Sequence, residues 1–72
     1  MPQMTQVPKD THLVEVRDES YGYTLAHRYN GRVVYVATYQ NTNDAMRQAQ
    51  KIVDHEQADG HKVVLVSDPH LS

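Results

Sequence analysis

The stretch Leu25-Ala26-His27-Arg28-Tyr29-Asn30-Gly31-Arg32-Val33-Val34-Tyr35-Val36 decides the fold of this chain. Asn-Gly is the strongest short signal for a β-hairpin, because a type I′ turn needs positive φ at both central residues. β-branched and aromatic residues, which are typical of strands, stand on both sides of the pair. The sequence therefore predicts a hairpin whose strands cover residues 21–29 and 32–39.

Three further elements are predicted on either side of this hairpin. Residues 12–17 alternate between apolar and polar, and residues 62–67 contain the apolar run Val63-Val64-Leu65-Val66, so both are expected to be strands. Asn41 or Thr42 can cap a helix, and Gly60 suits its end. The apolar residues of that helix recur at helical spacing: Ala45, Met46, Ala49, Ile52 and Val53.

These elements predict an α+β fold of order βββαβ, with a three- to four-stranded, mainly antiparallel sheet and one helix packed on one face. A parallel last strand would need a right-handed crossover. We expect one domain over residues 12–68, a flexible N-terminal tail over 1–11 and a C-terminal tail over 69–72.

The composition narrows the classes of function. The chain has 72 residues, no cysteine, and seven basic against nine acidic residues, for a formal net charge of -2. This excludes disulfides and cysteine-based metal sites, and it disfavours nucleic acid as the direct partner. The N-terminal residues lack the pattern of a signal peptide, and no run is long enough for a membrane helix, so we expect a cytoplasmic protein, or one in a host's cytoplasm.

The register of the hairpin predicts which side chains share a face. A two-residue turn opposes Tyr29 to Arg32, His27 to Val34 and Leu25 to Val36. Under the helix we therefore expect Val14, Val16, Tyr23, Leu25, Val34 and Val36. The opposite face would collect Leu13, Glu15, Arg17, Thr24, Ala26, Arg28, Val33, Tyr35, Ala37 and Tyr39. One helix cannot cover both faces, so this second face is expected to be open.

The open face is the candidate binding site. Tyrosine and arginine are enriched at interaction hot spots, so Tyr35, Tyr39 and Arg28 are predicted to anchor a partner, with Arg17 at the rim. Val33 is the further partner-binding residue expected on this face. An alternative is that the tyrosines merely reflect strand propensity on a solvated face. A one-residue slip or a bulge would also exchange the two faces.

Motifs for catalysis and metal binding are not found in the sequence. The five histidines form no His-x-x-x-His pair, and His55-Glu56 lacks the second histidine of a zinc-protease helix. His55 and Asp59 lie one helical turn apart, where they could share an ion or form an exposed polar pair. No nucleophile elbow and no phosphate loop occur. We therefore expect no enzyme activity, no cofactor and no metal site.

The segment from Tyr21 to Val53 resembles in layout the DNA-binding domain of three strands and a helix found at integrase N-termini and in plant ethylene-response-type factors. The resemblance lies in Asn30-Gly31-Arg32-Val33-Val34-Tyr35-Val36-Ala37-Thr38-Tyr39 followed by Asn43-Asp44-Ala45. It implies DNA recognition through Arg17, Arg28 and Tyr35 on the sheet. That family is clearly basic, whereas this chain is not.

The last 45 residues or so are similar in layout to small phage proteins such as the T7-type inhibitor of host RNA polymerase. The order of elements is also similar to that of YegP-like bacterial and phage modules. Together the resemblances imply a binding module. The leading prediction is a phage or mobile-element inhibitor that occludes host machinery, such as RNA polymerase, gyrase or a CRISPR complex. A DNA- or RNA-binding module and a small homodimeric accessory protein are the alternatives.

Overall fold

The hairpin forms around Asn30-Gly31 as predicted. It joins β2 (Gly22–Tyr29) to β3 (Arg32–Tyr39) in a computed structural model that describes residues 9–67. Both turn residues have positive φ, 51° at Asn30 and 82° at Gly31, as a type I′ turn requires. Tyr29 faces Arg32 across the first rung of the ladder.

The hairpin forms half of a four-stranded sheet. β1 (Thr11–Glu19) pairs antiparallel with β2, and β4 (Lys62–Ser67) pairs parallel with β1, which gives the strand order β3-β2-β1-β4. The predicted α+β fold of order βββαβ is therefore confirmed. Most of both predicted tails lies outside the described residues, although Thr11 is buried in β1.

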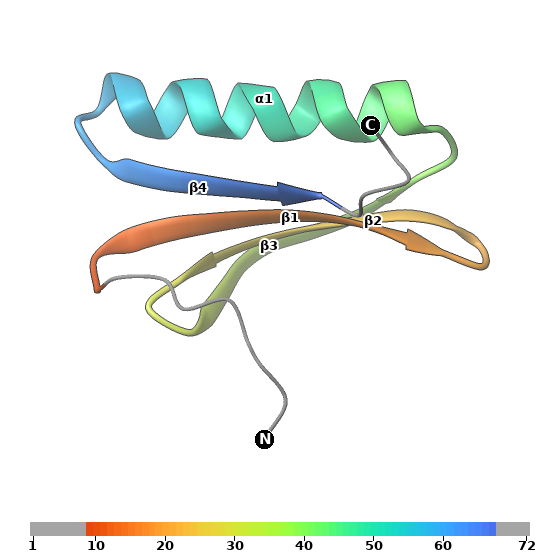
Figure 1. The fold of residues 1–72 in the computed structure, drawn as a ribbon, viewed down its shortest axis with the longest axis horizontal. Helices are drawn as coiled ribbons and strands as arrows, with labels where there is room; N and C mark the ends of the chain where they lie inside the picture. Colours follow the sequence, from red (N-terminus) through yellow and green to blue (C-terminus); the bar gives the residue numbers. More distant parts are fainter. Residues whose placement is uncertain (1–8, 68–72) are drawn as a thin grey trace.

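The helix α1 (Thr42–Ala58) connects β3 to β4 and lies along one side of the sheet (Figure 1). Asn41 is its N-cap and accepts a hydrogen bond of 2.9 Å from the backbone N–H of Asp44. Gly60, with a φ of 85°, follows its end. Nowhere in residues 9–67 does a helix combine the length and the apolar character that crossing a membrane requires.

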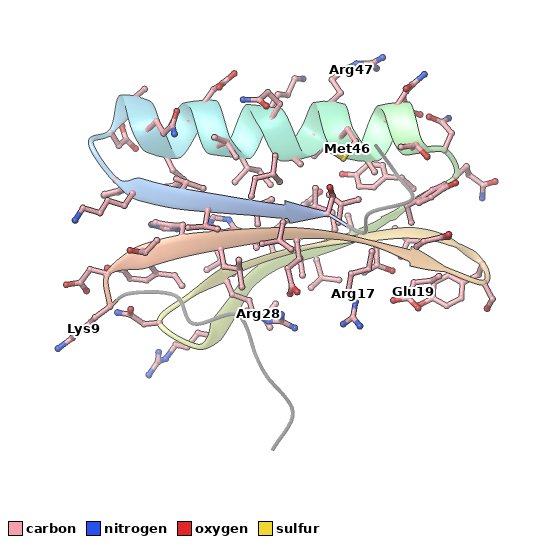
Figure 2. The ribbon with its side chains drawn as sticks, viewed as in Figure 1. Lys9, Arg17, Glu19, Arg28, Met46 and Arg47 are labelled. Atoms are coloured by element: carbon pink, nitrogen blue, oxygen red, sulfur yellow. The ribbon has the colours of Figure 1, made fainter. Side chains whose placement is uncertain are left out.

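The core lies between α1 and the two central strands. Its buried members are Val14, Val16 and Leu25 from the sheet and Ala45, Ala49 and Val53 from the helix. Met46 points toward the sheet while Arg47 points away from it (Figure 2). The predicted apolar face of the helix is therefore the face that packs.

The register of the hairpin changes after its second rung. Arg28 faces Val33, but His27 faces Tyr35, so Val34 is an extra residue in β3. Such a β-bulge moves every later side chain of the strand to the other face. The expected pairs of His27 with Val34 and Leu25 with Val36 are therefore wrong.

Candidate functional site

The open face is the side of the sheet turned away from α1. By the strand pairing it carries Leu13, Glu15, Arg17, Thr24, Ala26, Arg28, Val33, Val36, Thr38, Val64 and Val66. Arg17 and Arg28 project from this side in Figure 2. The Arg28 guanidinium forms an ion pair with the carboxylate of Glu15, so its charge is largely neutralised. Arg17, Arg28 and Val33 thus lie on the predicted face.

Tyr35 and Tyr39 lie on the opposite side, and their predicted place on the open face is wrong. The bulge at Val34 turns both rings toward α1, where Tyr39 packs against the core together with Tyr23. The hydroxyls of Tyr35 and Tyr39 lie 3.5 Å apart. Tyr39 therefore helps to cover the core and does not face the solvent as an anchor for a partner. The Tyr35 side chain is still 42% exposed.

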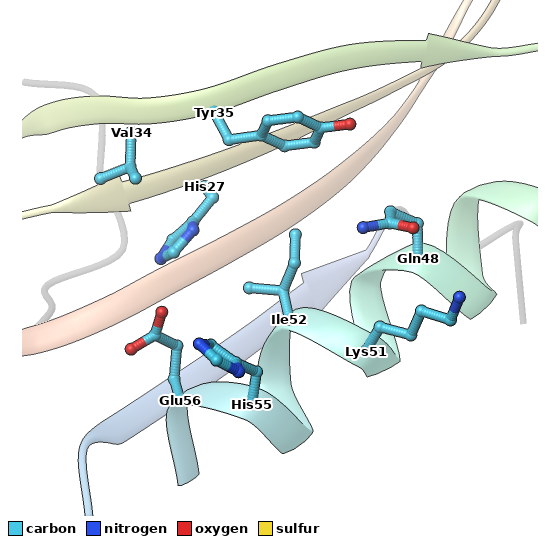
Figure 3. Close-up of a pocket in the computed structure, with 8 residues that line it drawn as sticks. All are labelled: His27, Val34, Tyr35, Gln48, Lys51, Ile52, His55 and Glu56. Atoms are coloured by element: carbon cyan, nitrogen blue, oxygen red, sulfur yellow. The ribbon is translucent and has the colours of Figure 1, made fainter. Parts of the chain in front are cut away.

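A groove of about 420 Å³ runs between β3 and α1 (Figure 3). It is lined by His27, Val34, Tyr35, Gln48, Lys51, Ile52, His55 and Glu56. Its β3 side is apolar, and its α1 side combines the apolar Ile52 with polar and charged groups. The groove is therefore amphipathic, with Lys51 as its permanent cation.

The strand beside this groove is an edge of the sheet. β3 pairs with β2 alone among the described strands. Val33, Val34, Tyr35 and Val36 are all 42% to 57% exposed, on both faces of the strand. Residues 33–39 include no charge and no proline, the usual features that protect an edge strand from pairing with another chain.

A second feature, the histidine cluster, consists of His12, His27, His61 and Glu56. His12 Nδ1 and His27 Nε2 are 2.8 Å apart in a buried hydrogen bond. Glu56 Oε1 lies 2.7 Å from His61 Nδ1 and 3.5 Å from His12 Nε2. The cluster could not be predicted from a sequence motif, because its members are far apart in the sequence. The parallel pairing of β1 with β4 forms the cluster, because it brings the start of β4 beside His12.

The electrostatics of the cluster follow from these contacts. The hydrogen bond with His61 lowers the pKa of Glu56, against the opposing effect of burial. Burial lowers the pKa of His27, and the neighbouring His12 adds to this effect. His55 and Asp59 lie outside this cluster and form an exposed pair at 3.7 Å, one helical turn apart.

The partly buried position of Tyr39 against the core predicts a loss of stability at alkaline pH. Burial, followed by the interaction with Tyr35 and the charge of Asp44, raises the pKa of Tyr39 to about 12. In the unfolded chain the phenol ionises at about pH 10. The neutral phenol therefore contributes fully to the free energy of unfolding below about pH 10. This contribution is lost as the pH rises toward about 12. The urea concentration at the midpoint of unfolding should decrease across this pH range. In Tyr39→Phe the decrease should be smaller. An equally steep fall in that variant would contradict the assignment.

The chain matches no protein-family model, no curated protein and no solved structure. The resemblances in layout therefore stay predictions. The features that the fold itself presents are the open face, the groove with its exposed edge strand, and the histidine cluster.

Proposed function

We propose that this chain is a protein-binding module that takes an extended segment of its partner as an additional strand beside β3. The observation that carries the proposal is the exposed apolar edge Val33–Val36 lying directly beside a groove. Strand addition of this kind draws its affinity from backbone hydrogen bonds and its specificity from pockets for alternate side chains.

The geometry of β3 supports such a mode. Side chains of an added strand alternate between the two faces of the sheet. Those directed toward α1 would enter the groove and contact Val34, Tyr35 and Ile52. Those directed the other way would continue the open face beside Val36, which is 54% exposed. Side chains on both faces of the partner strand would therefore bury apolar surface.

Charge indicates the chemistry of the partner segment. Two charged side chains, Lys51 and Glu56, line the groove. The Glu56 carboxylate already pairs with His61 at 2.7 Å, so Lys51 is the group that an acidic side chain of the partner would meet. A second copy of this chain pairing through β3 would form a two-fold contact, in which residue i of one copy meets residue j of the other and the reverse. The groove suits an apolar, extended segment with an acidic residue, and sedimentation separates this partner from self-association.

Strand addition beside β3 does not by itself identify the partner or the compartment. An inhibitor of host nucleic-acid machinery acting in the cytoplasm is supported by the layout resemblance only and stays a prediction. Nucleic-acid binding through the open face is disfavoured by the ion pair of Arg28 with Glu15 and by the net charge of -2.

The test selects binders from a library of random peptides displayed on phage, with the folded chain as bait. Selected peptides should alternate apolar with other residues and should carry a carboxylate. Val34→Glu places a charge in the groove, and it should weaken their binding at least about tenfold, a loss of about 1.4 kcal/mol. Val36→Glu, on the other face of the same strand, should weaken binding less. Leu65→Glu is the control that should leave binding unchanged, because Leu65 is an exposed apolar residue on β4 at the far edge of the sheet.

Three results would contradict the proposal. One is that no peptide is enriched over an unrelated bait. Another is that Val36→Glu removes binding while Val34→Glu keeps it, which would assign the site to the open face. The third is a concentration-dependent dimer in sedimentation that Val34→Glu dissolves, which would make a second copy the occupant.

A further inference from the structure

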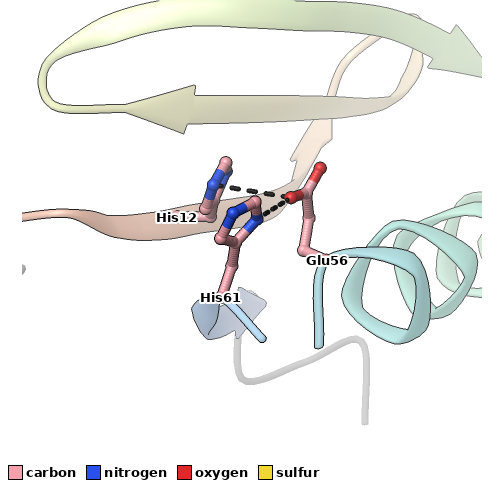
Figure 4. Close-up of side chains that lie close together, drawn as sticks. All are labelled: His12, Glu56 and His61. Carbon is pink, nitrogen blue, oxygen red and sulfur yellow. Dashed lines mark hydrogen bonds and ion pairs between the residues drawn. The ribbon is translucent and has the colours of Figure 1, made fainter. Parts of the chain in front are cut away.

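Three side chains that commonly bind metal ions, His12, Glu56 and His61, lie close together (Figure 4). His12 comes from the start of β1, Glu56 from the last turn of α1, and His61 from the residue before β4. Their ligand atoms all lie within 4.8 Å of one another. We propose that His12, Glu56 and His61 bind one divalent transition-metal ion of the zinc type.

The spacing of the ligand atoms suits a single ion. Donor atoms around a tetrahedral zinc ion lie about 3.4 Å apart, given bonds of about 2.0–2.2 Å. Here Glu56 Oε1 is 3.5 Å from His12 Nε2 and 2.7 Å from His61 Nδ1. The rings of His12 and His61 have centroids 5.1 Å apart, close to the separation of about 5 Å for two imidazoles on one such ion. In this structure the rings of His12 and His61 are stacked at an interplanar angle of 25°. Binding of the ion would turn the exposed His61 ring and replace its 2.7 Å hydrogen bond with Glu56.

The surrounding structure holds the ligands in place. His12 is buried, its Nδ1 is hydrogen-bonded to His27, and its ring stacks on Tyr29. A ligating histidine is typically oriented by such a bond at its other ring nitrogen. The backbone N–H of His61 donates to the carbonyl of Glu56 at 2.9 Å, which ties two of the ligands together across the end of α1. These contacts preform the site.

The donor set indicates the class of metal. Two imidazole nitrogens and one carboxylate favour zinc, copper, nickel or cobalt, whereas magnesium and calcium prefer sites made of oxygen ligands. Three protein ligands leave a coordination position for water or another ligand. The metal site and the strand-binding groove share one residue, Glu56, while His12 and His61 belong to the metal site alone.

The experiment titrates the chain, freed of any histidine tag, with Zn²⁺ alone in a calorimeter, and with Co²⁺ while its visible absorption is recorded. One ion should bind per chain, and the cobalt complex should show the spectrum of a tetrahedral site. His61→Ala and Glu56→Gln should each weaken Zn²⁺ binding by more than about 100-fold, since even losses around the ligands cost 10–100-fold. His55→Ala is the matched control, because His55 is an exposed histidine outside the ligand set.

The wild-type chain gives a second readout that does not depend on the variants folding. In nitrogen NMR of the histidine rings, Zn²⁺ should shift Nε2 of His12 and Nδ1 of His61, with little change at His55. The proposal is overturned if Zn²⁺ fails to saturate at one ion per chain or shifts other histidines instead. It is equally overturned if His55→Ala loses as much affinity as His61→Ala. The three side chains would then form a hydrogen-bonded cluster only.

Discussion

Replacing Leu25 by alanine should lower the free energy of unfolding by about 3 kcal/mol, within the range of about 2–5 kcal/mol for buried leucines. Leu25 is fully buried and is the largest such side chain, between β2 and α1. A domain of this size rarely has more than about 3–5 kcal/mol of stability in total. The variant should therefore be largely unfolded at ambient temperature, as urea titration followed by circular dichroism would show.

The matched control is Val36→Ala on the same sheet. Val36 is exposed on the open face, so its truncation should change stability by no more than about 0.5 kcal/mol. A Leu25→Ala variant that unfolds at the wild-type urea concentration would contradict the position of the core. So would a Val36→Ala variant that loses as much stability as Leu25→Ala.

Gly22→Ala should be the second strongly destabilising change. Gly22 has a φ of 142°, and a β-carbon there would lie 2.5 Å from the backbone carbonyl oxygen of Tyr39. The unusual backbone conformation alone costs about 1–3 kcal/mol for a residue with a side chain. Because β3 would also have to move away from β2, the total should exceed that range. The loss would appear as a fall in melting temperature in calorimetry.

Gly31→Ala provides the comparison for this glycine. Gly31 also has positive φ, at 82°, but no atom beyond its two chain neighbours lies within 4 Å of the added carbon. Its substitution should cost only the strain of the left-handed conformation, about 1–2 kcal/mol. Equal losses in the two variants would mean that the close approach of Tyr39 to Gly22 is absent in solution.

Most of the fold could be predicted because its signals are local. Asn30-Gly31 specifies the turn, and the change of apolar period after Tyr39 specifies the helix. The bulge at Val34 could not be predicted in the same way. Neither glycine nor proline marks it, and it is stabilised by tertiary packing, in which Tyr39 reaches the core beside Tyr23.

The candidate site was predicted less well for the same reason. One extra residue in β3 moved Tyr35 and Tyr39 from the open face to the side of α1 and left Val36 exposed in their place. The bulge does not affect the predicted face of Arg17, Arg28 and Val33. Val33 precedes the bulge in β3, and the two arginines lie on other strands. The histidine cluster depends on the pairing of β1 with β4, which no short-range pattern indicates.

Methyl NMR of the chain, titrated with a peptide selected as described above, tests most directly whether the groove beside β3 binds a partner strand. The account predicts shifts at the methyl groups of Val34 and Ile52, which line the groove, and slower hydrogen exchange along β3. Val64, on the open face at the far side of the sheet, should not move. Shifts confined to Val64 and its neighbours on the open face, with unchanged exchange along β3, would contradict it.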